Sequence, residues 1–452
     1  MKTHFHFKFF IPFFAAAVLL LPAGLLSQWS ALGTGTNGEV RSLITFNGQL
    51  IAAGDFTTTG GIGANRIAGW NGTTWSALGL GTNGRVSALT VFSNELIVAG
   101  DFSQVGGVSA GRIAKWNGTN WLLFGNNQTF NNDIYSLAIY NNELYAAGSF
   151  TNIGGNTRNR IARWSGSAWE SVGIGLNGTA RTLKVYNNAL VVGGEFTTAG
   201  GVNANRVASW NGSSWSALGL GVNNTVYSLE IMNSELIVGG SFTTVGGVSV
   251  NRIAKWNGSW SALGTGTNST VFSLHNAAGI IYAGGDFTSA GGISANRIAR
   301  WNGTSWTAMS TGMSGGDPIE VLAISVYATL LYAGGDFTSA GGNTVNNITR
   351  WATPTALEPV GVNLPDKYSL GQNYPNPFNP MTNIGFQISG FGFVSLKVYD
   401  ITGKEVAMLV NQELNAGVYN VNFDASHLSS GTYFYRMETA GFSDVKKMIL
   451  AK

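Results

Sequence analysis

The chain has 452 residues, of which only 10% are charged, and its formal net charge is +3. So small a charge implies no strong electrostatic attraction to nucleic acid, and we expect no nucleic-acid partner. The absence of cysteine excludes disulfides, thiolate metal sites and cysteine nucleophiles, and the spacing of the four histidines suits no metal site. We therefore expect no cofactor and no metal.

Residues 1–27 have the pattern of a secretory signal peptide. Lys2 and Lys8 flank the start, an apolar run covers Phe9–Leu21, and small or turn-forming residues follow. The run is shorter than the roughly 20 residues that a membrane span needs, although a retained anchor is the alternative. We expect Sec export, cleavage near residues 24–28 and no transmembrane segment in the mature chain.

One motif recurs seven times over residues 28–352. Its tryptophans mark the period, because those after Trp29 follow at steps of 46, 46, 48, 46, 45 and 46 residues: Trp75, Trp121, Trp169, Trp215, Trp260 and Trp306. A fixed period of this length predicts a repeat architecture. What recurs in every copy is expected to be scaffold, so a unique site should lie where the copies differ.

The first copy is predicted to form four short strands. β-branched and aromatic residues favour strands, and the Asn-Gly pairs between the runs are hairpin signals. The runs are Val40–Phe46, Leu50–Phe56, Arg66–Trp70 and Trp75–Gly79. Four antiparallel strands per copy match a propeller blade. The predicted fold class is therefore all-β, a seven-bladed β-propeller with four-stranded blades.

The order of the strands predicts how the ring closes. A strand of the fourth type, Trp29–Gly33, precedes all the others, whereas the seventh copy ends after its third strand at Trp351. The N-terminal strand is expected to complete the last blade. Such a closure joins the two ends of the repeat region and leaves no open seam.

This pattern resembles kelch-type propellers. The matching features are an apolar strand that ends in a small pair, such as Gly193-Gly194, and two aromatic residues that flank a tight turn, such as Trp70 and Trp75. Kelch units usually carry tyrosine at the first aromatic position, where this chain has tryptophan. The resemblance covers about residues 28–352. It implies a fold and no particular activity.

The repeat stops after Trp351. Prolines indicate a linker over residues 353–365, and residues 366–452 are predicted to form a small Ig-like β-sandwich. Its strand candidates are Asn383–Ile388, Val394–Tyr399, Gly417–Phe423, Thr432–Glu438 and Asp444–Leu450.

Three motifs of this tail resemble the type A C-terminal sorting domain of type IX secretion cargo. They are Gln372–Pro380, Val398–Val406 and Gly431–Arg436. The resemblance implies a Bacteroidetes-like source, Sec export and then passage across the outer membrane, with the type IX machinery as partner. It also implies an extracellular or outer-membrane-surface location, where the tail is removed and the cargo is released or attached.

One polar position follows the second strand of every copy. Serine occupies it twice, at Ser149 and Ser241, and carboxylates occupy it at Asp55, Asp101, Glu195, Asp286 and Asp336. If these side chains meet at one end of a channel, they form a ring that could bind a cation. The alternative is that each caps its own turn or pairs with an arginine of its repeat, namely Arg66, Arg112, Arg206 or Arg297.

The copies differ most in two loops. The third copy has a longer loop at Asn126–Asp133, and the seventh has Ser310–Pro318. Both precede the first strand of their blade, so they should emerge on the same face. Glu39 and two arginines also occupy non-repeating positions. The predicted binding residues are Arg85, Asp133, Tyr135, Arg181 and Asp317, and drift in surface loops is the alternative.

No motif for catalysis is found. The sequence has no Gly-x-Ser-x-Gly elbow, phosphate loop or zinc signature, and its acidic residues outside the repeated position are scattered. We predict no catalytic residue. The favoured function is a secreted or cell-surface module that binds a glycan or a protein. The alternatives are a structural or adhesive surface component and a polysaccharide lyase or hydrolase.

Overall fold

The computed structural model describes residues 28–352, 365–390, 392–414, 416–425, 428–439 and 441–452. The predicted signal peptide and all of the predicted linker except Pro365 lie outside these residues. Contacts separate a unit over Gln28–Thr353 from one that contains Pro354–Lys452. In the described part, no helix has the length and apolar character to cross a membrane.

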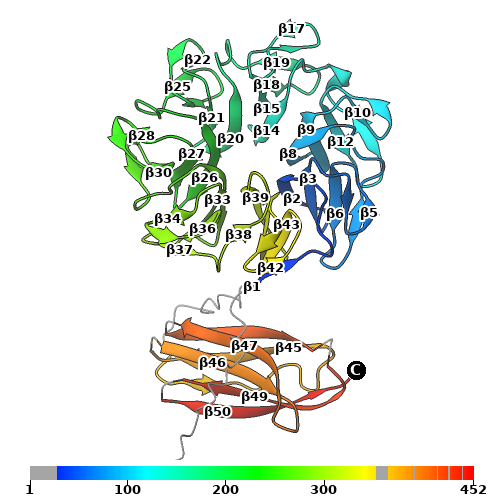
Figure 1. Cartoon of the computed structure of the whole chain (residues 1–452), viewed down its shortest axis with the longest axis vertical. Coiled ribbons are helices and arrows are strands. Elements are labelled where there is room, and N and C mark those ends of the chain that lie inside the picture. Colours follow the sequence, from blue (N-terminus) through cyan, green and yellow to red (C-terminus); the bar gives the residue numbers. More distant parts are fainter. Residues whose placement is uncertain (1–27, 353–364, 391, 415, 426–427, 440) are drawn as a thin grey trace, which may run out of the picture. The chain divides into compact units, whose positions relative to one another are not determined.

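The first unit is built from four-stranded antiparallel sheets set around a ring, seven of them within residues 28–352 (Figure 1). The innermost strands are β2 (Val40–Phe46), β8 (Arg85–Phe92), β14 (Ile134–Tyr140), β20 (Ala180–Tyr186), β26 (Val226–Met232), β32 (Val271–Ala277) and β39 (Glu320–Tyr327). Each contacts the innermost strand on either side, β2 with β39 included, so the ring is closed.

The other strands follow outward in the same order in every sheet. The second strands are β3 (Gln49–Gly54), β9 (Glu95–Asp101), β15 (Glu143–Gly148), β21 (Ala189–Gly194), β27 (Glu235–Gly240), β33 (Ile280–Gly285) and β40 (Leu330–Asp336). The third strands are β6 (Ile67–Trp70), β12 (Ile113–Trp116), β18 (Ile161–Trp164), β24 (Val207–Trp210), β30 (Ile253–Trp256), β36 (Ile298–Trp301) and β43 (Ile348–Ala352). The outer strands are β7 (Trp75–Ala77), β13 (Trp121–Leu123), β19 (Trp169–Ser171), β25 (Trp215–Ala217), β31 (Trp260–Ala262), β37 (Trp306–Ala308) and β1 (Gln28–Ala31).

A small hairpin connects the second and third strands of each sheet. The pairs are β4 (Thr58–Thr59) with β5 (Ile62–Gly63), β10 (Gln104–Val105) with β11 (Val108–Ser109), β16 (Asn152–Ile153) with β17 (Asn156–Thr157), β22 (Thr198–Ala199) with β23 (Val202–Asn203), β28 (Thr244–Val245) with β29 (Val248–Ser249), β34 (Ser289–Ala290) with β35 (Ile293–Ser294) and β41 (Ser339–Ala340) with β42 (Asn343–Thr344). The last hairpin also pairs with β38 (Met313–Ser314), and a 3-10 turn covers Gly125–Asn127.

The N-terminal strand lies where the strand order predicts. β1 pairs antiparallel with β43, with Trp29 opposite Trp351, and it forms the outer edge of the sheet that contains β39 and β40. The first and last segments of the repeat region therefore share one sheet.

Local sequence explains the hairpins and the buried strands. Asn47 and Gly48 have φ values of 47° and 72°, which is the left-handed backbone that a two-residue hairpin turn requires. The second strands are buried on both faces, as their continuous apolar runs predict.

The tryptophans lie at the contacts between neighbouring sheets. Trp215 is only 7% exposed, and its Nε1 donates a hydrogen bond of 3.1 Å to the carbonyl of Val172, at the end of the preceding sheet. Corresponding bonds are donated by Trp29, Trp75, Trp121, Trp260 and Trp306. These residues therefore join consecutive sheets, as their recurrence predicts.

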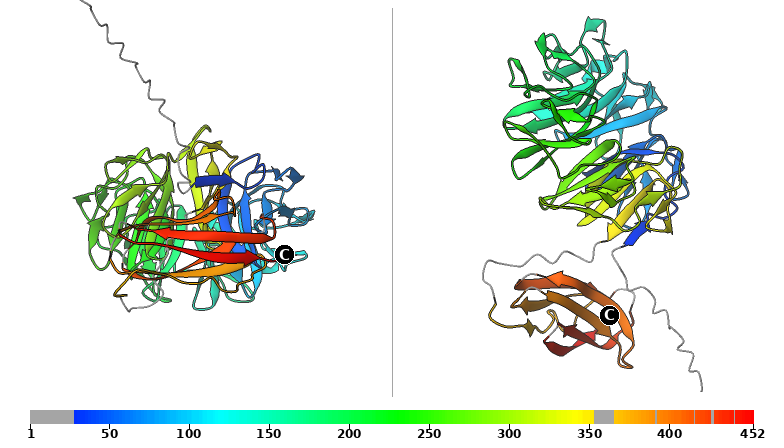
Figure 2. Two further views of the ribbon diagram at one scale, coloured as in Figure 1. Left: turned by 90° about the horizontal axis from the view of Figure 1, so that it is seen from below. Right: turned by 60° about the vertical axis from the view of Figure 1, so that its left-hand side comes forward.

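The second unit has two sheets that share one apolar core (Figure 2). One contains β44 (Ser369–Leu370), β45 (Met381–Ile388) and β48 (Gly417–Asp424), and the other β46 (Gly392–Tyr399), β47 (Glu405–Leu414), β49 (Gly431–Glu438) and β50 (Ser443–Leu450). The ten-residue strand β47 is not among the strands predicted from the sequence. Its Glu, Ala, Met and Leu residues favour helix, but pairing with β46 decides its conformation.

Candidate functional site

Every innermost strand has an irregularity in its pairing with the second strand, just after its first buried residue. The register shifts between Val40 and Ser42 in the first sheet, and at the equivalent position in the other six. Such a bulge redirects the side chain of its extra residue. The residues at the bulges are Arg41, Ser87, Tyr135, Arg181, Tyr227, Phe272 and Leu322.

A glycine opposite each bulge allows the bulged backbone to approach the second strand closely. A Cβ on Gly54 would collide with the carbonyl oxygen of Glu39, and one on Gly148 with that of Asp133. The last glycine of each apolar strand is therefore required by the close approach of the bulged backbone. This explains why the small pair recurs in every copy.

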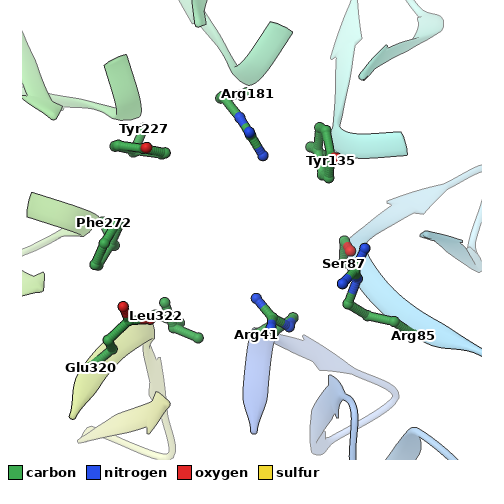
Figure 3. A pocket seen from close by; sticks show the side chains of 9 residues that line it. All are labelled: Arg41, Arg85, Ser87, Tyr135, Arg181, Tyr227, Phe272, Glu320 and Leu322. Atoms are coloured by element: carbon green, nitrogen blue, oxygen red, sulfur yellow. The ribbon is translucent and has the colours of Figure 1, made fainter. Parts of the chain in front are cut away.

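The bulge residues surround one pocket on the axis of the ring (Figure 3). It has a volume of about 400 Å³, within the range of small-molecule sites. Its lining consists of the seven bulge residues together with Arg85 and Glu320. All seven sheets contribute to it, and no two neighbouring bulge residues are identical. The pocket is the place on the axis where the repeat symmetry is broken.

A chain of polar contacts links the second and third sheets. Nη2 of Arg85 donates to Oδ2 of Asp133 at 2.8 Å, and the hydroxyl of Tyr135 donates to the same oxygen at 3.2 Å. Asp133 is only 8% exposed, so this carboxylate orients both side chains from behind the pocket wall.

Aromatic rings continue the wall around the axis. The guanidinium of Arg181 lies 4.5 Å from the ring centre of Tyr135 and 5.9 Å from that of Tyr227, and it is paired with Glu195 at 2.7 Å. Tyr227 and Phe272 meet edge to face with centroids 5.1 Å apart. These four side chains form a continuous π-faced arc.

The opposite side of the pocket is acidic. Arg41 is paired with Glu39 and Asp55. Burial raises the pKa of Glu320, and the carboxylates of Glu39, Asp286 and Asp336 raise it further, against the opposing effect of Arg41. Burial likewise raises the pKa of Glu39.

We expect Glu320→Gln to raise the melting temperature at pH 7–8. A carboxyl group whose pKa is higher in the folded chain than in the unfolded one destabilises the fold above the folded pKa. That cost disappears as the pH falls to the unfolded value of about 4.3, so the gain should shrink in acid. Thermal melts from pH 4 to 8 measure this. Glu235→Gln is the control, because Glu235 is paired with Lys255 at 2.8 Å and should give no gain. A lower melting temperature for Glu320→Gln at pH 8 contradicts the prediction.

The structure brings four of the five predicted binding residues together. Arg85, Tyr135 and Arg181 line the pocket, and Asp133 lies directly behind Arg85 and Tyr135. Asp317 does not line it. Its carboxylate instead acts on Asp336, whose pKa is raised by burial and by Asp317.

The two irregular loops mostly serve packing. In Asn126–Asp133, Phe130 is fully buried against Phe150 and Trp169, and Asn126 donates to the carbonyl of Ser167 at 2.7 Å. In the seventh copy Met313 is buried and Ser314 pairs with β41.

Three of the five repeated carboxylates are paired with an arginine. Asp55 is paired with Arg41, Asp101 with Arg112 at 3.3 Å, and Glu195 with Arg181. Neither these three nor Asp286 and Asp336 line the pocket. No group of three or more histidine, aspartate and glutamate side chains in the described residues is placed to hold a metal ion. In the first sheet, the turn that follows the second strand is capped by a residue of the preceding loop. There, Oδ1 of Asn37 accepts from the N–H groups of Thr57 and Thr58.

More than half of the lining is missing from the residues predicted from the sequence, namely Arg41, Ser87, Tyr227, Phe272, Glu320 and Leu322. A signal was present, because each bulge residue directly follows the first buried apolar residue of its innermost strand. Aligned on that residue, the copies carry Arg, Ser, Tyr, Arg, Tyr, Phe and Leu, whereas the flanking positions vary much less in character.

Comparisons with known proteins find family models that match parts of both units. Residues 372–451 match the family model of a secretion system C-terminal sorting domain. Residues 93–118, 141–163 and 234–262 match that of a β-propeller domain of unknown function. The first match implies that the chain is type IX secretion cargo, recognised by that machinery and delivered outside the cell. No curated protein matches.

Two solved structures are similar at low identity. PorZ, described as an essential surface component of the type IX secretion system of Porphyromonas gingivalis, is 14% identical with a TM-score of 0.44. The match covers 96% of this chain and 61% of PorZ, so the chain spans less than two thirds of that protein. A protein of unknown function from Bacteroides thetaiotaomicron is 11% identical with a TM-score of 0.37, with 72% of each chain covered.

Proposed function

We propose that this type IX cargo is an extracellular or outer-membrane-surface binding module whose axial pocket takes a glycan. In this proposal residues 28–352 are a seven-bladed, kelch-like propeller and residues 366–452 an Ig-like sorting domain, preceded by a signal peptide at residues 1–27. Ligand binding belongs to the propeller, and the tail serves export.

The observation that carries the proposal is the pairing of aromatic faces with polar groups in one pocket. Tyr135, Tyr227 and Phe272 offer π-faces, while Arg41, Arg85 and Arg181 offer donors, and all six line the same 400 Å³ space. A sugar ring has apolar C–H faces and hydroxyls at its edge, so it needs both kinds of contact at once. Pockets of this type use a few converging polar groups for orientation and apolar surface for affinity.

The two alternative functions, a polysaccharide lyase or hydrolase and a structural or adhesive surface component, explain less of this geometry. Most glycoside hydrolases use two carboxyl groups about 5–9.5 Å apart across the scissile bond. Glu320 is the one carboxylate among the lining residues of the described pocket. A purely structural or adhesive role does not account for the asymmetric set of bulge residues around the pocket.

Glycan arrays with the full chain test the proposal. We expect Tyr135→Ala and Phe272→Ala each to weaken binding about tenfold, because losing an aromatic contact of about 1–1.5 kcal/mol changes affinity by that factor. Lys115→Ala is the matched control, since Lys115 is paired with Glu95 at 2.8 Å and does not line the pocket.

A loop-exchange variant tests whether the ligand binds in the pocket or at the two irregular loops. Residues 126–132 and 310–316 are exchanged for the short loop of the second copy, which leaves the pocket lining in place. We expect binding to persist. Binding that survives both aromatic substitutions but is lost on this exchange would move the site to the loops, and binding of no glycan would refute the proposal.

A further inference from the structure

We infer that the axial pocket selects uncharged saccharides. Its arginines act as hydrogen-bond donors, and carboxylates outside the pocket wall neutralise their positive charge. This inference rests on the proposed function, because it names the class of glycan that the same pocket takes.

Each lining arginine has a carboxylate partner outside the pocket wall. Arg85 is paired with Asp133 at 2.8 Å and Arg181 with Glu195 at 2.7 Å. Arg41 is paired with both Glu39 and Asp55. None of these four carboxylates lines the pocket. The ligand therefore meets guanidinium groups that are already neutralised.

The charge balance around the pocket is negative. Three lining arginines are paired with four carboxylates behind the pocket wall, and Glu320, which lies in the lining itself, is a fifth carboxylate. Burial and neighbouring carboxylates raise the pKa of Glu39 and Glu320 in spite of Arg41. A uronate carboxylate brought here would approach these groups, and like charges at an interface disfavour the wrong partner.

The arginines nevertheless keep directional donors for a ligand. Their side chains are 31%, 31% and 30% exposed for Arg41, Arg85 and Arg181. The ion pairs engage Nε or Nη2, and Nη1 of these three residues makes no hydrogen bond within residues 28–352. Hydroxyl groups of a neutral sugar can accept from these donors and donate to Glu320, without the cost of dehydrating a charged group on the ligand.

Titration of the full chain with oligosaccharides of matched length tests the selectivity. Neutral probes are partial hydrolysates of β-glucan and mannan, and acidic probes are hydrolysates of alginate and polygalacturonate. We expect a neutral probe to bind at least tenfold more tightly than the best oligouronate. Its affinity should change less than about twofold between 50 and 500 mM NaCl, because no net charge is paired on binding.

The titration distinguishes a failure of this inference from a failure of the proposed function. Tighter binding of an oligouronate, weakening as salt is added, overturns the inference and leaves the proposed function intact. Binding of neither class overturns both.

Removing a carboxylate from behind an arginine gives a second test. Glu195→Gln exposes the charge of Arg181, and Glu195 is 37% exposed, so the fold should tolerate the change. We expect oligouronate affinity to rise at least about threefold relative to neutral-probe affinity, since an unpaired charge interacts more strongly with an anion. Glu95→Gln, which unpairs Lys115 away from the pocket, should leave the ratio unchanged. An unchanged ratio in Glu195→Gln contradicts the inference, because structural damage alone would not raise affinity for an anion.

Discussion

Deletion of residues 28–33 is expected to lower the free energy of unfolding of the repeat unit by more than about 5 kcal/mol. The loss has two sources. Trp29 is 1% exposed, packs edge-on against Trp351 with centroids 4.8 Å apart, and donates to the carbonyl of Met309 at 3.2 Å. Leu32 is fully buried, and its carbonyl accepts from Nε1 of Trp75 at 2.9 Å. Residues 28–33 therefore stabilise both the last sheet and the first sheet of the ring.

Calorimetry on the deletion variant measures this effect, with a chain that begins at Gln28 as the control. The variant would also expose the edge of β43, which is paired with β1 in the intact chain. An unpaired edge strand promotes association, so we expect aggregation on heating at a lower temperature. A deletion variant as stable as its control would show that the ring closes without β1.

The second large effect is expected at the tryptophans between sheets. Trp215→Ala should destabilise the fold by about 3–5 kcal/mol, the range for truncating a buried aromatic residue. Trp215 packs in one cluster with Val172 and Leu176, which lie in the connection from the preceding sheet. Its ring also closely approaches Gly200, which has no side chain to fill the cavity. Chemical denaturation at 25 °C measures the change.

Phenylalanine variants separate packing from hydrogen bonding. Trp215→Phe removes one of the two hydrogen bonds that the Val172 carbonyl accepts, the other coming from Gly175. Nε1 of Trp169 is buried without a hydrogen-bond partner in the described residues, so Trp169→Phe loses no such bond. We expect Trp215→Phe to cost about 0.5–1.5 kcal/mol more than Trp169→Phe. Equal costs would mean that the hydrogen bond contributes nothing to the contact between sheets.

Much of the fold is predictable because its determinants are local and repeated. Apolar runs and paired tryptophans recur in every copy and Asn-Gly turns in most of them, so each copy supports the interpretation of the others. The position of Trp29 before the first full copy predicts its pairing with β43. Strand β47 was not predicted, because its determinants are neither repeated nor local. It occurs once, its residues favour helix, and only the neighbouring strand β46 determines its pairing.

By itself, the sequence determined the repeat, the turns, the closing strand, the sorting motifs and the idea that a site lies where copies differ. That idea identified Arg85, Asp133, Tyr135 and Arg181, which do lie at one place. Only the tertiary structure decided that Arg41, Tyr227, Phe272 and Glu320 belong with them, and that Asp55 and Glu195 lie behind arginines. The physical reason is the bulge. A one-residue shift in register redirects one side chain per innermost strand, and these side chains meet because the ring of sheets is closed.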